Sequence, residues 1–166
     1  RSRPRMIIID ECWQFMKEGS LLKKVIEEAF RRSRKYNAGI IIITQSVLDL
    51  IQFGSIGDVI KGSSAFQFFL ESPHFEKAKA EKLIDYDEFT IEWMKTVKSN
   101  KPRYSEIFMD TPFGIGIVRL VVDDFNYYKY TSAGPEIAEI ETMVDHDGLT
   151  YEQAIREMIK RHRSSP

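Results

Sequence analysis

The sequence predicts an α/β fold: a parallel sheet with flanking helices, followed by an antiparallel hairpin or meander and C-terminal helices. Two apolar runs, Met6-Ile7-Ile8-Ile9 and Ile40-Ile41-Ile42-Ile43, each end in polar residues. Uninterrupted runs of this kind are typical of parallel strands that are buried on both faces. Between them, residues 20–36 place their apolar side chains at helical spacing, with Ser20 as the expected N-cap. Strand, helix and strand together predict a βαβ unit.

The next segment continues the alternation of helices and strands. We expect helices at 47–53, 74–84 and 87–97, and a further buried strand at 65–70, where five of six residues are apolar. The cluster Ser99-Asn100-Lys101-Pro102 predicts a turn that ends this part of the chain.

The character of the sequence changes after Arg103. Short turn-like connections predict three antiparallel strands, at 104–109, 116–122 and 127–131. Two helices are expected to close the chain. One begins after Pro135, a residue that suits the first helical position. The other begins after Thr150, which forms a capping box with Gln153.

Length and composition limit the classes of protein to consider. The 166 residues are enough for a single domain, with an α/β core at 1–102, antiparallel strands at 103–132 and helices at 133–166. The net charge of −1 gives no overall indication of nucleic acid or an anionic membrane as partner. The single cysteine, Cys12, excludes an internal disulfide and fits a reducing compartment. No apolar run reaches the roughly 20 residues that a transmembrane segment needs.

The acidic pair Asp10-Glu11 directly follows the first apolar run. Carboxylates at the C-terminal end of a buried strand have the form of a Walker B motif, because ligands of open α/β sheets bind at that edge. Asp10 would hold Mg²⁺ through a coordinated water. Glu11 would orient or deprotonate the water that attacks the γ-phosphate of ATP. The alternative is that the pair only ends a strand before a loop.

A polar group also follows the second apolar run, in Thr44-Gln45-Ser46. Because the two strands are expected to be neighbours, the side chain of Gln45 should lie near Asp10. There it would contact the γ-phosphate or the attacking water and act as a glutamine sensor. The alternative is a helix N-cap made by Thr44 or Ser46, and both interpretations can hold together.

A basic cluster, Arg31-Arg32-Ser33-Arg34-Lys35, ends the helix between the two strands. On a helical wheel Arg31, Arg34 and Lys35 lie opposite the apolar stripe, where they face solvent or a neighbouring subunit. An arginine finger that reaches a nucleotide on the next protomer fits this placement. The alternative is a favourable interaction of these cations with the helix macrodipole.

No G-x-x-x-x-G-K-[ST] phosphate-binding loop occurs in the 166 residues. The usual order places that loop before the acidic strand, and this chain begins directly before the strand. We therefore expect the chain to be the C-terminal part of a larger ATPase, with negligible hydrolysis by itself.

Other reactive groups are interpreted as structural. The three histidines are scattered and have no metal-ligand spacing. Cys12 has no histidine in a sequence relation to it, which favours a buried structural thiol over a nucleophile. The aromatic residues of the segment 125–130 could stack on nucleobases, but a core or partner contact is the more common use of such residues.

Three ordered segments, 7–13, 31–37 and 43–46, together with the segment 116–132, resemble the C-terminal ATPase domain of the conjugative type IV secretion ATPases of the TraC class. The wider group includes the HerA and FtsK motor ATPases. In this resemblance Asp10 and Glu11 are the Walker B pair, residues 31–35 the basic motif, and Gln45 the glutamine motif.

The resemblance implies a RecA-like P-loop NTPase core that uses ATP and Mg²⁺ and forms a homo-hexamer in the full-length protein. It also implies a location at the cytoplasmic face of the bacterial inner membrane, beside other type IV secretion subunits, with DNA or protein as cargo. Two other functions stay open from the sequence: a DNA translocase of the HerA/FtsK type, and a non-catalytic docking domain.

Overall fold

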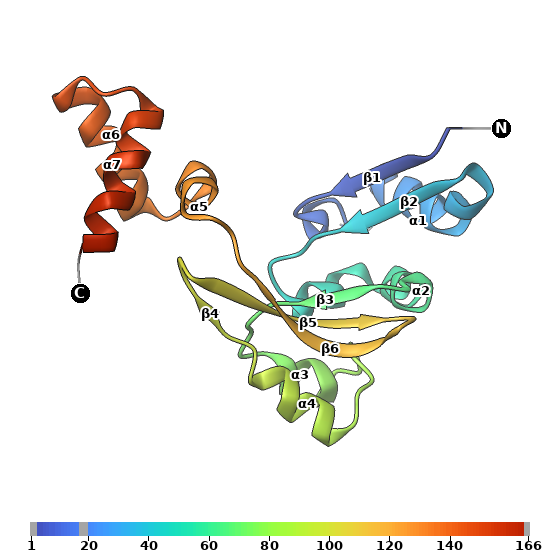
Figure 1. The fold of residues 1–166 in the computed structure, drawn as a ribbon. Coiled ribbons are helices and arrows are strands. Elements are labelled where there is room, and N and C mark those ends of the chain that lie inside the picture. Colours follow the sequence, from blue (N-terminus) through green and yellow to red (C-terminus); the bar gives the residue numbers. More distant parts are fainter. Residues whose placement is uncertain (1–2, 17–19, 165–166) are drawn as a thin grey trace. The chain divides into compact units, whose positions relative to one another are not determined.

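The computed structural model describes residues 3–16 and 20–164 (Figure 1). The chain forms two compact units. Unit 1 comprises residues 1–98 and 106–118, and unit 2 comprises residues 99–105 and 119–166.

The elements follow the predicted alternation through the first two thirds of the chain. In chain order up to residue 98, they are β1 (Arg5–Ile9), the 3₁₀ helix η1 (Cys12–Phe15), α1 (Leu21–Arg32), the 3₁₀ helix η2 (Ser33–Tyr36), β2 (Ala38–Ile42), the 3₁₀ helix η3 (Val47–Phe53), α2 (Ser55–Ser63), β3 (Gln67–Phe69), α3 (Phe75–Ala80) and α4 (Glu88–Lys95). The remaining elements are β4 (Ser99–Asn100), β5 (Tyr104–Thr111), β6 (Gly114–Leu120), α5 (Asp124–Tyr130), α6 (Gly134–Asp147) and α7 (Tyr151–Ser164).

The predicted βαβ unit is confirmed. Strands β1 and β2 pair in parallel, from Arg5 opposite Ala38 to Ile9 opposite Ile42. Helix α1 connects them and begins at the expected cap, where the Ser20 hydroxyl oxygen accepts a hydrogen bond from the backbone amide of Leu22 at 3.2 Å. This cap satisfies one of the amides that the first turn of a helix leaves unpaired.

The predicted burial of the first strand on both faces is wrong for the described part of the chain. The side chains of Met6 and Ile8 are 66% and 60% exposed. A strand is buried on both faces only where layers of structure cover both. Within the described residues β1 pairs with β2 alone, and one hydrophobic core packs against one face of this pair. That core is the cluster of Cys12, Met16, Ile26, Phe53, Ile56 and Ile60.

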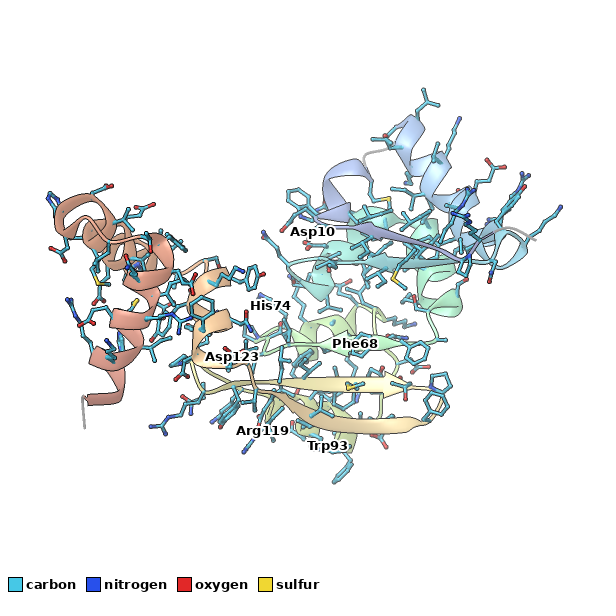
Figure 2. All side chains as sticks on the ribbon, turned by 45° about the horizontal axis from the view of Figure 1, so that its top comes forward. Asp10, Phe68, His74, Trp93, Arg119 and Asp123 are labelled. Carbon is cyan, nitrogen blue, oxygen red and sulfur yellow. The ribbon has the colours of Figure 1, made fainter. Side chains whose placement is uncertain are left out.

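The strand predicted at 65–70 is shorter and less buried than expected. It forms only β3, which pairs antiparallel with β5, so that Phe69 lies opposite Phe108. Side chains alternate across a strand, so Phe69 packs on a core cluster while Phe68 points to the other face and is 58% exposed (Figure 2). An apolar run therefore became a strand with one covered face.

Helices α3 and α4 cover one face of the sheet formed by β3, β5 and β6 (Figure 1). Their core is centred on Phe108 of β5, which is fully buried and packs edge-on against the rings of Tyr86 and Trp93. The cluster consists of Phe75, Ala78, Leu83, Ile84, Ile91, Met94, Val97 and Phe108.

The predicted antiparallel strands are confirmed for β5 and β6, which form a hairpin, but the strand predicted at 127–131 is wrong. This segment is helix α5. The Asp123 carboxylate accepts a hydrogen bond from the backbone amide of Asn126 at 3.1 Å, which caps the helix. Tyr128 is then buried against the last two helices. The part of the chain predicted as antiparallel strands therefore ends at β6.

Unit 2 has its own helical core. Both predicted C-terminal helices are confirmed: Pro135 lies in the first turn of α6, and Thr150 and Gln153 exchange the two hydrogen bonds of a capping box before α7. The buried residues of this unit are Tyr128, Ile140, Met143, Ala154, Ile155 and Met158. In the part of the chain that the structure describes, no helix combines the length and apolarity needed to cross a bilayer.

Candidate functional site

The carboxyl ends of the two parallel strands bring the predicted polar residues together. Asp10 and Glu11 directly follow β1, and Gln45 lies three residues after β2. The side-chain amide of Gln45 donates a hydrogen bond to Oε1 of Glu11 at 2.8 Å. The backbone amide of Ile43 also donates to the carbonyl of Ile9 at 3.0 Å, which extends the pairing beyond β2. Residues 34 positions apart in the sequence therefore meet at one edge of the sheet, as expected for neighbouring parallel strands.

Glu11 is held on its second oxygen by a residue that the sequence analysis did not assign to the site. The indole Nε1 of Trp13 donates a hydrogen bond to Oε2 of Glu11 at 2.7 Å. The backbone of Glu11 is left-handed, with φ 52° and ψ 41°, a conformation that costs a non-glycine residue of the order of 1–3 kcal/mol. The sequence alone does not indicate this role for Trp13, because an indole two residues after Glu11 is equally compatible with simple core packing.

Asp10 keeps one carboxylate oxygen available. Its Oδ1 accepts a hydrogen bond from the backbone amide of Glu11 at 3.0 Å, and its Oδ2 accepts none from the described residues. The side chain is exposed at the end of β1 (Figure 2). Magnesium prefers hard oxygen ligands and keeps several of its waters. A single exposed carboxylate oxygen is therefore the kind of group that could hold Mg²⁺ through a coordinated water.

Ser46 fills the N-cap role that was the alternative interpretation of this segment. The Ser46 hydroxyl oxygen accepts a hydrogen bond from the backbone amide of Leu48 at 3.2 Å. The backbone amide of Ser46 in turn donates to the carboxylate of Asp49 at 3.0 Å. The Thr44 hydroxyl donates to the Ser46 carbonyl at 3.1 Å. These contacts fix the backbone on both sides of Gln45 and leave its side chain to reach Glu11, so cap and contact coexist.

The basic stretch is not brought to the carboxylates within this chain. The basic stretch ends near the N-terminal ends of β1 and β2, whereas the carboxylates lie at the C-terminal ends. The backbone amide of Arg5, the first residue of β1, donates to the carbonyl of Asn37 at 3.1 Å. Five strand residues separate the two ends by about 17 Å. Arg31 pairs with Glu27 one turn earlier at 2.9 Å, and Lys35 is exposed. The side chain of Arg34 lies outside the described residues.

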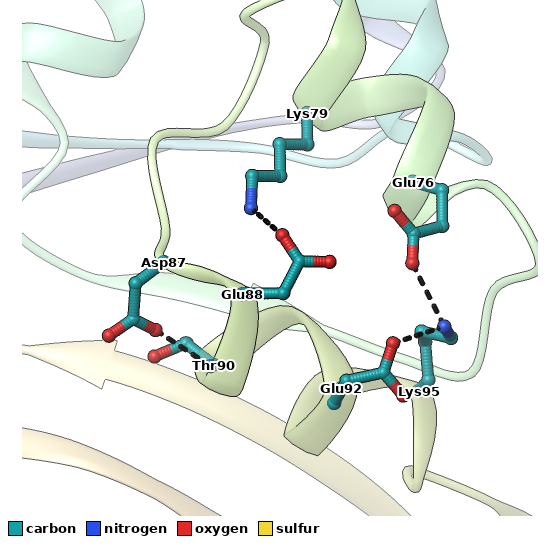
Figure 3. Close-up of polar contacts among 7 residues, drawn as sticks. All are labelled: Glu76, Lys79, Asp87, Glu88, Thr90, Glu92 and Lys95. Carbon is teal, nitrogen blue, oxygen red and sulfur yellow. Dashed lines mark hydrogen bonds and ion pairs between the residues drawn. The ribbon is translucent and has the colours of Figure 1, made fainter.

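A second group of charged side chains lies on α3 and α4 (Figure 3). The carboxylates of Glu76, Glu88 and Glu92 are close enough to share a cation, and all three are exposed. Each is already paired with a lysine: Lys79 contacts Glu88 at 2.6 Å, and Lys95 contacts Glu76 at 2.9 Å and Glu92 at 2.5 Å. The hydrogen bonds that Lys95 donates to Glu92 and Glu76 raise its pKa. The group is therefore an ion-pair network between two helices.

Fold and site together define an α/β protein whose parallel strands present an acidic pair and a glutamine at their carboxyl ends. Residues 1–162 match the model of the TraG P-loop domain family, and the chain belongs to this family. The resemblance to the conjugative type IV secretion ATPases is thereby confirmed at the level of the family.

Among solved structures, the chain is similar to VirB4 of Thermoanaerobacter pseudethanolicus, with a TM-score of 0.52 and 16% sequence identity. The similarity covers 81% of this chain and 33% of that protein, so this chain spans about a third of its length. At this identity the likeness concerns the fold, and the α/β core predicted from the sequence is confirmed by it. No curated protein matches the sequence.

Proposed function

We propose that the chain carries the water-activating half of the active site of an ATP-hydrolysing motor, which powers conjugation or type IV secretion. The observation that carries this proposal is the hydrogen bond from Gln45 to Glu11 across the ends of β1 and β2. A pair of parallel strands that holds a carboxylate and an amide in contact suits a group that must orient water beside a phosphate. Membership of the TraG P-loop domain family supports the same class of reaction.

Each residue of the site then has a role. Glu11 orients or deprotonates the attacking water, and each of its two bonded oxygens retains a second lone pair for that contact. Asp10 would hold Mg²⁺, and the ion would supply positive charge beside the phosphates of ATP. Gln45 senses the state of the site, because it bonds the carboxylate and belongs to the segment that leads into η3.

The sequence contains no phosphate-binding loop, so the phosphates of ATP would have to be held by residues outside these 166. We infer that hydrolysis requires the parent protein, and that the chain alone turns ATP over negligibly.

The position of the basic stretch supports a ring. Since Arg31 and Lys35 lie at the far end of the strands from Glu11, they would have to act on the nucleotide of a neighbouring protomer, and the same holds for Arg34. A homo-hexamer satisfies this requirement. In the proposed setting the hexamer sits at the cytoplasmic face of the inner membrane, contacts other type IV secretion subunits and moves DNA or protein.

Substitution of Glu11 in the full-length protein tests the proposal. Glu11→Gln removes the charge and the base but keeps the size of the side chain, so kcat for ATP should fall about 100-fold or more. Glu152→Gln is a matched control, because Glu152 is an exposed glutamate of α7 that pairs with Arg156, outside the proposed site. Equal hydrolysis by wild type and Glu11→Gln would reject the catalytic role and favour a docking domain.

The same assay tests action between protomers. Arg34→Ala and Glu11→Gln should each inactivate a homo-hexamer. Mixing them creates interfaces that join an intact Glu11 to an intact Arg34, so activity should partly return. Mixed hexamers without any recovered activity would contradict the trans role of the arginine.

A further inference from the structure

The carboxylate of Glu11 accepts hydrogen bonds from two side chains that come from different parts of the fold. Gln45 reaches Oε1 from the segment after β2, and Trp13 reaches Oε2 from η1. Both distances, 2.8 and 2.7 Å, are in the range of charge-assisted hydrogen bonds to a carboxylate. A glutamate side chain has three rotatable covalent bonds. Two hydrogen bonds from donors on separate elements restrict this rotation more than either hydrogen bond alone.

Trp13 is well built for this contact. Its ring packs against the core cluster of Cys12, Met16, Ile26, Phe53, Ile56 and Ile60, while its nitrogen reaches out to Glu11. The indole nitrogen is only a donor, so it can hold a carboxylate oxygen but cannot compete with Glu11 for the proton of a water. A tryptophan anchored at its apolar end therefore presents a fixed N–H at its polar end.

The backbone makes this approach possible. The left-handed conformation of Glu11 turns the chain from β1 directly into η1. This turn brings the side chain of Trp13 back toward the carboxylate of Glu11. The amide of Cys12 donates to the carbonyl of Ile43 at 3.3 Å and ties this turn to the end of β2. The turn is thus held in place next to the partner strand.

We propose that Trp13 is a positioning residue for ATP hydrolysis: its indole N–H and the Gln45 amide together hold the Glu11 carboxylate in the orientation that faces the attacking water. This inference rests on the proposed role of Glu11. A small misplacement of a reacting group costs rate steeply. Loss of the indole hydrogen bond should therefore lower kcat by about tenfold or more and leave KM for ATP within about twofold.

The sharpest test removes the donor and keeps the shape. In the full-length protein Trp13 is replaced by benzothienylalanine, in which a sulfur takes the place of the indole N–H. The same replacement at Trp93 is the matched control, because that ring packs on Phe108, whereas the indole hydrogen bond to Glu11 comes from Trp13. We expect kcat to fall at position 13 and to stay unchanged at position 93, with similar melting temperatures. A fall of less than fivefold at position 13 would overturn the proposal.

A spectroscopic measurement separates positioning from packing, and it does not depend on turnover. The indole N–H resonance of Trp13 should move when Glu11→Ala removes its acceptor, while that of Trp93 should not. An unmoved Trp13 resonance would also overturn the proposal.

The two proposals fail in different ways. Full activity of Glu11→Gln would reject the proposed function itself. An inactive Glu11→Gln variant, combined with a fully active benzothienylalanine protein, would reject only the positioning role of Trp13.

Discussion

Cys12 is a neighbour of the candidate site in sequence, but its thiol takes no part in it. It directly follows Glu11, yet its side chain is fully buried in the core cluster beneath β1 and β2. Burial away from water raises the pKa of the thiol to about 11, because the charged thiolate is poorly solvated there. At neutral pH the residue is a small apolar group. The prediction of a buried structural thiol is confirmed.

We expect this thiol to resist modification. At pH 8 the reaction of Cys12 with Ellman's reagent should be about 100-fold or more slower in the native protein than in urea, since only the thiolate reacts and burial blocks access. Stopped-flow absorbance measures both rates on the same sample. A native rate equal to the unfolded rate would show that Cys12 is accessible and ionised.

At the level of elements, α5 shows local capping prevailing over composition. The segment 127–131 is rich in tyrosine, and such residues favour strands. Asp123, however, bonds both the backbone amide and the side-chain amide of Asn126, so the chain enters a helix at this point. The helix then turns Tyr128 toward α7, where its ring contacts His162.

The cap of α5 should depend on pH. The hydrogen bonds from Asn126 lower the pKa of Asp123. A lowered pKa means that the stabilisation is present above the ordinary pKa of a carboxyl and is lost as pH falls through the lower folded value. Asp123→Ala should therefore lower the melting temperature at pH 7, and the difference from wild type should narrow below about pH 4.

Circular dichroism at 222 nm measures this effect, and Asp123→Asn is the control. Asparagine caps nearly as well as aspartate but does not titrate in this range, so it should keep most of the stability at every pH. Equal losses for the Ala and Asn variants, or a loss that does not change with pH, would show that Asp123 does not act as a cap.

At the level of the whole molecule, the chain has two compact units, each with its own buried residues. Ile91 of α4 and Ile140 of α6 are both fully buried, the first in unit 1 and the second in unit 2. Separate cores allow each unit to lose stability by itself.

Substitution of these two isoleucines tests that independence. Ile140→Ala and Ile91→Ala each remove a buried side chain and should cost about 2–5 kcal/mol of unfolding free energy in their own unit. Hydrogen exchange by mass spectrometry should show lost protection in residues 119–166 for Ile140→Ala and in residues 20–98 for Ile91→Ala. Equal loss across both units in either variant would contradict separate cores.

Features that depend on neighbouring residues were predictable from the sequence. The parallel pair 6–9 and 40–43 and the helix caps at Ser20 and Thr150 all follow from short-range periodicity and capping chemistry, and all are confirmed. Gln45 was expected near Asp10, and it meets the next residue of the acidic pair, Glu11, because parallel neighbours bring their carboxyl ends to one edge.

Only the tertiary structure decided which faces are covered and which donors reach the site. The exposure of Met6, the pairing of β3 with β5 and the helix at 124–130 depend on what packs against each segment, and apolar content alone does not specify this. The contact of Trp13 with Glu11 depends on a left-handed turn at a non-glycine residue, which sequence patterns do not indicate. The sequence thus determined the strand pair and its acidic end, and the fold determined how the carboxylate of Glu11 is held there, because hydrogen bonds at this site join residues from separate elements.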